Sequence, residues 1–358
     1  MTNKQLINSY ASLGELLLNP DEKLSELIDA APNFNAWFTP ENTLRCVKSL
    51  GKMLNTNDLE RWLSSEPEDV SSGFNDPKAP SLVFNNPTAD DHSVKTIGLV
   101  LAGNIPLVGF HDILCVLASG HKALVKLSSQ DNKLTVFLLQ KLIEIEPEFE
   151  GRVEYTERLK DFDAVIATGS NNTSRYFDYY FAKVPHIIRK NRNSIAVLTG
   201  LETTEQLNHL GNDIFNYFGL GCRNVSKLYV PVGYNFNTFF ESIESFSRVA
   251  DHHKYNNNYD YNKSIFLVNL QKHLDNGFLL LKEDTRIASP LAVLYYEEYA
   301  DRKGLEANLL SLEKQLQCIV TGTPLNISSQ EVSFGKSQEP KLWDYADGVD
   351  TMKFLKGV

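Results

Sequence analysis

Hydrophobic side chains recur at helical spacing over residues 1 to about 65. Leu6 and Leu13 begin this periodicity, and Leu44 continues it after a proline. The pattern predicts an N-terminal layer of helices. Residues 66–92 are rich in Ser, Pro, Asp and Asn, which is typical of a loop-rich connector.

Beyond this connector, short apolar runs alternate with helical patterns. Three runs have the length and branching of buried strands, namely residues 95–101, 122–127 and 164–167. The helices between them end at Gly120 and Pro147, and Ser128 or Ser129 is placed to cap the second one. This alternation predicts a parallel sheet with right-handed crossovers.

The remainder of the chain predicts a second α/β sheet. Its expected strands are residues 194–198, 227–230, 278–281, 291–296 and 317–321, and its expected helices are residues 202–218, 236–249 and 303–316. His252 and His253 open an Asn- and Tyr-rich stretch, residues 255–262, and are expected to be solvated loop residues rather than metal ligands. The aromatic C-terminal segment is expected to pack back onto the body.

Charge and cysteine content narrow the class of protein. The formal net charge of −10 argues against a nucleic-acid surface, and no apolar run approaches the length of a membrane span. The N-terminus lacks the apolar core of a signal peptide. Neither a disulfide framework nor a zinc site is indicated, because no CxxC pair occurs among Cys46, Cys115, Cys222 and Cys318. We therefore expect a soluble cytoplasmic protein.

Polar or glycine-containing turns follow the three strands of the first predicted sheet. They cover residues 102–106, 127–130 and 167–171, and a parallel sheet binds ligands beyond the carboxyl ends of its strands. The Gly169-Ser170 turn, at a helix start, offers backbone N–H groups to a phosphate. The sequence contains neither GxGxxG nor a Walker A motif.

A cysteine in a glycine-rich turn is the candidate nucleophile. Gly219-Leu220-Gly221-Cys222 follows a predicted helix, and Arg223 is adjacent. The thiolate is the reactive form of cysteine, so an accessible thiol beside a cation favours a catalytic role. The alternative is a structural cysteine behind a glycine helix cap.

Together these turns resemble the aldehyde dehydrogenase superfamily, and within it the acyl-CoA reductases that include the fatty-acid reductase of bacterial luminescence. The similar segments are Gly103-Asn104-Ile105-Pro106, residues 118–128, Thr168-Gly169-Ser170, Gly219-Leu220-Gly221-Cys222 and Val332-Ser333-Phe334-Gly335. The resemblance implies an α/β, aldehyde-dehydrogenase-like fold with a Rossmann-type cofactor domain and a second α/β catalytic domain. The expected domains are residues 1–193, 194–325 and a C-terminal segment, 326–358.

The resemblance also implies roles for individual residues. Cys222 is the expected nucleophile, and the Asn104 amide is expected to stabilise the oxyanion. Lys126 and Ser128 are expected at the adenosine end of a nicotinamide cofactor, and Gly169 and Ser170 beside its phosphates. A turn asparagine, a solvated lysine and a helix-capping serine are the structural alternatives for Asn104, Lys126 and Ser128.

Two departures from the superfamily pattern bear on the reaction. Residues 186–193 contain no carboxylate where aldehyde dehydrogenases carry the glutamate that activates water. The resemblance therefore implies acyl exchange with a thiol such as coenzyme A rather than hydrolysis. Ser129 stands where the superfamily has an acidic residue that binds the ribose, so NADP(H) is expected to be tolerated, with NAD(H) left open.

The implied activity is NADPH-dependent reduction of an acyl-CoA thioester to an aldehyde through a thioacyl-cysteine. An acyl-carrier-protein reductase, a CoA-acylating aldehyde dehydrogenase and a catalytically silent scaffold are the alternatives. The expected partner is the small-molecule acyl-CoA, whose coenzyme A is part of the substrate. A homo-oligomer and an acyl-transfer partner protein remain open.

Overall fold

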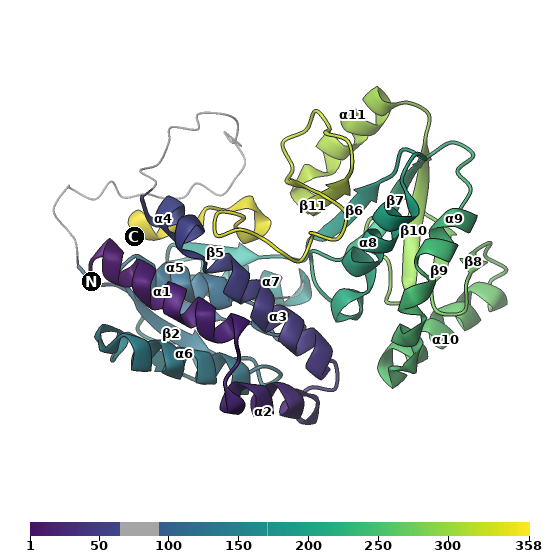
Figure 1. The fold of residues 1–358 in the computed structure, drawn as a ribbon. Coiled ribbons are helices and arrows are strands. Elements are labelled where there is room, and N and C mark those ends of the chain that lie inside the picture. Colours follow the sequence, from purple (N-terminus) through teal and green to yellow (C-terminus); the bar gives the residue numbers. More distant parts are fainter. Residues whose placement is uncertain (65–92, 170) are drawn as a thin grey trace. The chain divides into compact units, whose positions relative to one another are not determined.

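The chain forms two compact units, which are described separately. The computed structural model describes residues 1–64, 93–169 and 171–358, so the connector predicted over 66–92 lies outside the described residues. The first unit comprises Met1–Lys190 and Lys341–Val358, and the second is Asn191–Pro340 (Figure 1). The segment expected at 326–358 is therefore divided between the two units.

The first unit is built on a parallel five-stranded sheet. Its order is β3 (Val153–Tyr155), β2 (Lys122–Lys126), β1 (Thr96–Val100), β4 (Ala164–Thr168) and β5 (His186–Arg189). The predicted β1, β2 and β4 are confirmed. The sequence did not predict β3 and β5, since they are only three and four residues long and lack a continuous apolar run.

The strand order reverses between β1 and β4. Val100 of β1 is paired with Ala167 of β4, so the turns that follow these strands begin at the same edge of the sheet. In doubly wound sheets the ligand crevice forms where the order reverses in this way. The turn containing Asn104 and the turn at Gly169 are therefore at the expected ligand-binding edge.

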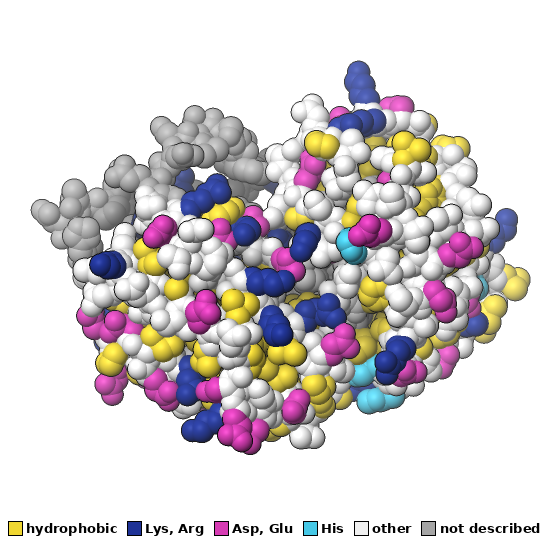
Figure 2. Space-filling view, viewed as in Figure 1, with side chains coloured by type: hydrophobic (Ala, Val, Ile, Leu, Met, Phe, Trp, Pro, Cys, Tyr) yellow, Lys and Arg dark blue, Asp and Glu magenta, His cyan; other side chains and the backbone are white. Residues whose placement is uncertain are grey.

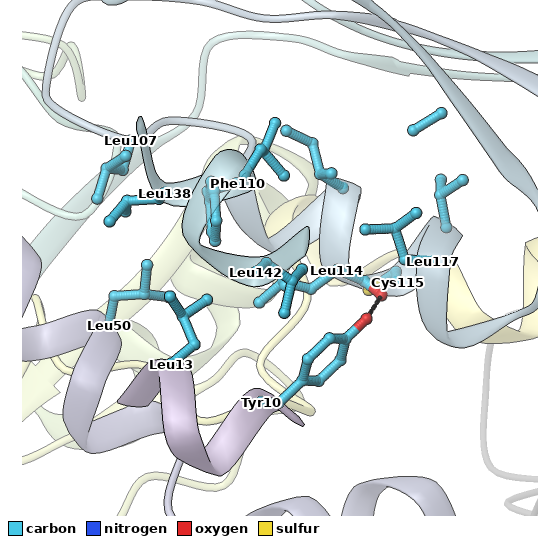
Figure 3. Close-up of a cluster of buried hydrophobic side chains, with 14 of the residues drawn as sticks. Tyr10, Leu13, Leu50, Leu107, Phe110, Leu114, Cys115, Leu117, Leu138 and Leu142 are labelled. Carbon is cyan, nitrogen blue, oxygen red and sulfur yellow. Dashed lines mark hydrogen bonds between the residues drawn. The ribbon is translucent and has the colours of Figure 1, made fainter. Parts of the chain in front are cut away.

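Two layers of helices cover this sheet on one side. The inner helices are α5 (Phe110–Ala118) and α6 (Lys133–Ile145), and α1 (Asn3–Leu18) packs against α6 and α3 (Pro40–Met53). Figure 3 shows Tyr10 of α1 directed at α5, where its hydroxyl donates to the Leu114 carbonyl at 2.9 Å. The predicted N-terminal helices are confirmed, with α2 (Glu22–Ala30) and α4 (Thr56–Ser64) completing the layer.

The last residues of the chain, Lys341–Val358, belong to the first unit. Leu342 is fully buried there, and α12 (Thr351–Lys356) packs against α5. The Trp62 indole donates to the Tyr345 hydroxyl at 2.9 Å, and the Arg61 guanidinium lies 4.0 Å from the centroid of the Trp343 ring. These contacts fix the segment to α4.

The second unit contains the predicted second sheet. Its strands are β12 (Glu331–Val332), β11 (Leu316–Thr321), β6 (Asn193–Val197), β7 (Val225–Pro231), β10 (Val293–Tyr299), β9 (Leu280–Glu283) and β8 (Leu274–Asp275), in that order. All neighbours are parallel except β8 and β9. Its α-helices are α8 (Thr204–Phe215), α9 (Asn237–Ser242), α10 (His253–Val268) and α11 (Arg302–Leu312).

His252 and His253 were expected to be solvated loop residues, but His252 is half-buried and caps α10, and His253 is exposed and begins this helix. The Asn- and Tyr-rich residues 255–262 also lie in α10. The aromatic rings of Tyr255 and Tyr259 are buried there and supply an apolar face despite the low helix propensity of the sequence. The His252 ring nitrogen Nδ1 accepts from the Tyr255 N–H at 3.4 Å. The helix expected over 236–249 is also shorter, because α9 ends at Ser242 and a 3₁₀ segment follows.

No helix in the described part of the chain is long and apolar enough to cross a membrane. Figure 2 shows dark-blue basic and magenta acidic side chains scattered over the drawn face of each unit. Positive charge on that face is thus interrupted by carboxylates and uncharged groups.

Candidate active site

Cys222 lies on a turn that is built by unusual backbone geometry. The expected helix over 202–218 ends earlier, at Phe215, after which Tyr217, Phe218 and Gly219 all adopt left-handed φ values of 54°, 57° and 78°. For the two non-glycine residues this conformation costs about 1–2 kcal/mol each. Burial of both rings offsets the strain, and the Phe218 ring lies against the His252 ring at a tilt of 32°, with centroids 4.2 Å apart.

Asn224 fastens the Cys222 turn to the end of α8. Its side-chain oxygen accepts from the Gly221 N–H at 2.8 Å, and its amide nitrogen donates to the carbonyls of Asp213 at 3.0 Å and Asn216 at 2.8 Å. The last carbonyls of a helix need such donors. Asn224 is buried, and our sequence analysis overlooked it, although an asparagine two residues after the cysteine is a typical turn-stabilising residue.

The Cys222 side chain is exposed, whereas Cys115 and Cys318 are buried and Cys46 is half-buried. The Cys222 carbonyl accepts from the Ser194 hydroxyl at 3.0 Å, so the backbone of the turn is also tied to β6. A structural core cysteine would be packed among apolar side chains. The observed exposure favours the catalytic alternative.

Arg223 was expected to favour the Cys222 thiolate by its charge, but its guanidinium binds another side chain. Its guanidinium is buried and donates twice to the Gln330 side-chain oxygen, at 2.9 and 2.7 Å. This pair anchors the turn to the residue that precedes β12. Arg223 therefore holds the backbone of the Cys222 turn in place.

Asp213 joins α8 to the late Phe-Gly turn. Its carboxylate accepts from the backbone N–H groups of Gly335 at 2.6 Å and Ser337 at 2.9 Å. Burial raises the pKa of Asp213 to about 6, and the two backbone hydrogen bonds partly oppose this shift. A single buried carboxyl thus connects the helix before the Cys222 turn with residues 332–337.

We expect Asp213→Asn to flatten the pH dependence of stability between pH 4 and 6. Since the folded-state pKa lies above the unfolded value, the folded protein binds the proton more tightly, and rising pH lowers the free energy of unfolding by up to about 3 kcal/mol. The asparagine cannot titrate. The measurement is urea unfolding of both proteins from pH 4 to 7. The free energy of unfolding of the variant, relative to that of the wild type, should therefore increase as pH rises. Equal pH dependence of the two free energies would contradict this prediction.

In the first unit, the Asn104 turn packs against the turn that follows β2. A Cβ atom on Gly103 would collide with the Ser128 hydroxyl and lie 2.9 Å from the Gln130 Cβ, so glycine permits this approach. The Asn104 side chain is exposed. Asn104 thus lies exposed at the edge of the sheet where a ligand is expected.

Lys126 and Ser128 lie at this edge as well. The Lys126 ammonium donates to the Glu157 carbonyl at 3.0 Å, and because an ammonium has three donors it can also bind a hydroxyl or phosphate. Ser128 is not a helix cap, since α6 begins at Lys133 after Asn132. Its hydroxyl instead accepts from the Gln130 N–H at 3.2 Å, within the turn itself.

Gly169 allows α7 (Asn171–Tyr180) to approach the end of β4. A Cβ atom there would lie 2.9 Å from the Phe177 ring and 3.1 Å from the Thr173 Cβ. Ser170 lies outside the described residues. The structure therefore brings Asn104, Lys126, Ser128 and Gly169 to one edge of one sheet, while Cys222 belongs to the second unit.

A comparison with protein-family models matches residues 4–231 to the family described as acyl-CoA reductase (LuxC). The match covers more than half of the chain. The chain belongs to this family. As an acyl-CoA reductase family member, it is an oxidoreductase that acts on acyl or aldehyde groups. The matched residues include Asn104, Lys126, Ser128, Gly169 and Cys222.

Solved structures show that this acyl-CoA reductase family member has the aldehyde dehydrogenase fold. Aldehyde dehydrogenase 21 from Physcomitrella patens matches with a TM-score of 0.66 and 13% identity, over 99% of this chain and 84% of that one. The NADP-dependent glyceraldehyde-3-phosphate dehydrogenase from Bacillus halodurans matches with a TM-score of 0.61 and 13% identity, over 93% and 79%. No curated protein sequence matches the chain.

Proposed function

We propose that the protein reduces an acyl-CoA thioester to an aldehyde with NADPH, through a thioester on Cys222. The observation that carries this proposal is an exposed cysteine on a turn held by buried hydrogen bonds, in a member of the acyl-CoA reductase family. A rigid turn keeps a nucleophile in one position, which lowers the entropic barrier to attack.

The first half-reaction is acyl transfer. The Cys222 thiolate attacks the thioester carbonyl, the carbon–sulfur bond to coenzyme A breaks, and the coenzyme A thiolate leaves. The Asn104 amide and the Cys222 backbone N–H stabilise the oxyanion, and one such donor contributes about 10²–10³ in rate. The product is an acyl group on the Cys222 sulfur.

The second half-reaction needs a hydride donor, which a bound NADPH supplies. Lys126, Ser128, Gly169 and Ser170 are the residues proposed to hold this cofactor. Lys126 and Ser128 would meet its adenosine end, where the Lys126 ammonium has donors left beyond its bond to the Glu157 carbonyl. The turn at Gly169 and Ser170, at the start of α7, would lie beside its phosphates. Two electrons and a proton convert the thioester to the aldehyde and return the Cys222 thiolate.

Residues 186–193 support reduction over hydrolysis. The segment has no carboxylate to activate water. The Arg189 side chain in this segment is buried and forms a salt bridge with Asp112, whose carboxylate oxygen lies 2.6 Å from the guanidinium nitrogen. Without a carboxylate in this segment to activate water, the acyl-cysteine is expected to survive long enough to be reduced.

The test is to mix the purified protein with a saturated acyl-CoA in the absence of any reductant. Mass spectrometry should detect the mass of one acyl group, and peptide mapping should place it on Cys222. Alkylation with iodoacetamide beforehand should prevent the addition. An acyl group on another residue, or none at all, would overturn the proposal.

A further inference from the structure

The turn that carries Asn104 is held from three directions by residues to which no function has been given. After β1 the chain bends through Leu107 and Gly109, both of which have left-handed φ values, 58° and 83°. Leu107 is not a glycine, so this backbone conformation requires compensating contacts. Figure 3 shows one of them, because the Leu107 side chain belongs to the same buried cluster as Leu138.

Two contacts come from the N-terminal helical layer. The Asn35 amide donates to the Gly103 carbonyl at 3.3 Å, and the Cys46 thiol donates to the Pro106 carbonyl at 3.1 Å. These carbonyls lie on either side of Asn104. Asn35 is itself fixed, because its side-chain oxygen accepts from the Trp37 N–H at 3.0 Å.

The third contact comes from Asp131, in the turn between β2 and α6. Its carboxylate accepts from the Leu107 N–H at 2.6 Å, the length of a strong charge-assisted hydrogen bond. Only 6% of Asp131 is exposed. Burial raises the pKa of Asp131 to about 6, and the bond from Leu107 opposes this shift.

We infer that Asp131, with Asn35 and Cys46, is a positioning residue that sets the Asn104 amide for oxyanion stabilisation, an inference that rests on the proposed function. Oxyanion donors act by being in place before charge develops, so small displacements of their backbone reduce the rate. The N-terminal helical layer is therefore part of the catalytic apparatus as well as a packing layer.

The test is a double-mutant cycle between Asp131→Ala and Asn104→Ala, read as the rate of thioester formation on Cys222 after mixing with acyl-CoA. Asn104→Ala should lower this rate about 10²–10³-fold, and Asp131→Ala about 10–100-fold. In the Asn104→Ala background, Asp131→Ala should cost less than about threefold, because the group it positions is gone.

Two further variants separate positioning from general damage. Asp131→Asn keeps a carbonyl acceptor for the Leu107 N–H and should stay within about fivefold of wild type. Asp21→Ala removes a more exposed carboxylate, which likewise accepts a backbone N–H, from Leu24 at 2.8 Å, but away from the Asn104 turn; it should leave acylation unchanged. Iodoacetamide alkylation of Cys222, which needs no oxyanion donor, should proceed at the wild-type rate in every variant.

The outcomes distinguish this inference from the proposed function. Equal losses from Asp131→Ala in both backgrounds, or a loss in Asp131→Asn as large as in Asp131→Ala, would overturn the positioning role alone. A wild-type protein that forms no thioester on Cys222 would overturn the proposed function and this inference with it.

Discussion

Cys222→Ser should lower acyl-CoA-dependent NADPH oxidation by about 10⁴-fold or more, since removal of a covalent nucleophile eliminates the acyl-enzyme route. Serine keeps the size of the side chain, but its hydroxyl has a far higher pKa than a thiol and is a much weaker nucleophile at neutral pH. The Cys222 side chain is exposed, so the substitution should leave the fold intact. The measurement is the decrease in NADPH absorbance with acyl-CoA present.

Cys115→Ala is the matched control for this prediction. Cys115 is buried in α5 of the first unit, and its loss should lower stability slightly while activity stays within about threefold. If Cys222→Ser instead retained wild-type turnover, Cys222 would not be the nucleophile. Loss of activity in both variants would indicate general destabilisation.

Arg189→Met should lower the free energy of unfolding of the first unit by about 3–5 kcal/mol, because it leaves the Asp112 carboxylate buried without its cation. Arg189 is 4% exposed and Asp112 is 6% exposed. The guanidinium donates to both Asp112 oxygens, at 2.6 and 3.0 Å, to the Ala346 carbonyl at 2.6 Å and to the Thr351 hydroxyl at 2.9 Å. Urea unfolding, followed by circular dichroism, measures the loss.

Lys190→Met provides the control at the neighbouring position. Lys190 forms an exposed salt bridge with Asp178 at 3.2 Å, and such pairs contribute about 0–1 kcal/mol. Replacing both buried partners, with Arg189→Met and Asp112→Leu together, should recover part of the lost stability because no unpaired charge remains. Equal effects of Arg189→Met and Lys190→Met would contradict the assigned role of the buried pair.

The parts of the fold that were predictable have signals within short stretches of sequence. β1, α5 and β2 combine continuous apolar runs with a helix that stops at Gly120, whose φ is 80°. By contrast, α10 is polar in composition, and its helix is stabilised by aromatic rings that are buried against the rest of the unit. Its burial depends on tertiary packing, which local propensity does not report.

The residues of the candidate site also fall into two groups, those with a local sequence signal and those whose role depends on tertiary packing. Cys222 and Asn104 could be proposed from their turns, because residue type and glycine spacing are local. The partners that hold these turns could not be proposed. Asp131 reaches Leu107 only because β1 and β2 are adjacent in the sheet. Asn35 and Cys46 require the packing of an entire helical layer, and no spacing in the sequence encodes that contact.

The division of the chain has a consequence for its biogenesis. Lys341–Val358 belongs to the first unit but is synthesised after the whole second unit. Until this segment emerges from the ribosome, Arg189 lacks its Ala346 and Thr351 partners, and the apolar sites filled by Leu342 and Phe354 remain uncovered. Domains usually fold in order of translation. Here the N-terminal unit is completed last, so the nascent protein must carry an unfinished apolar surface while the second unit is being made.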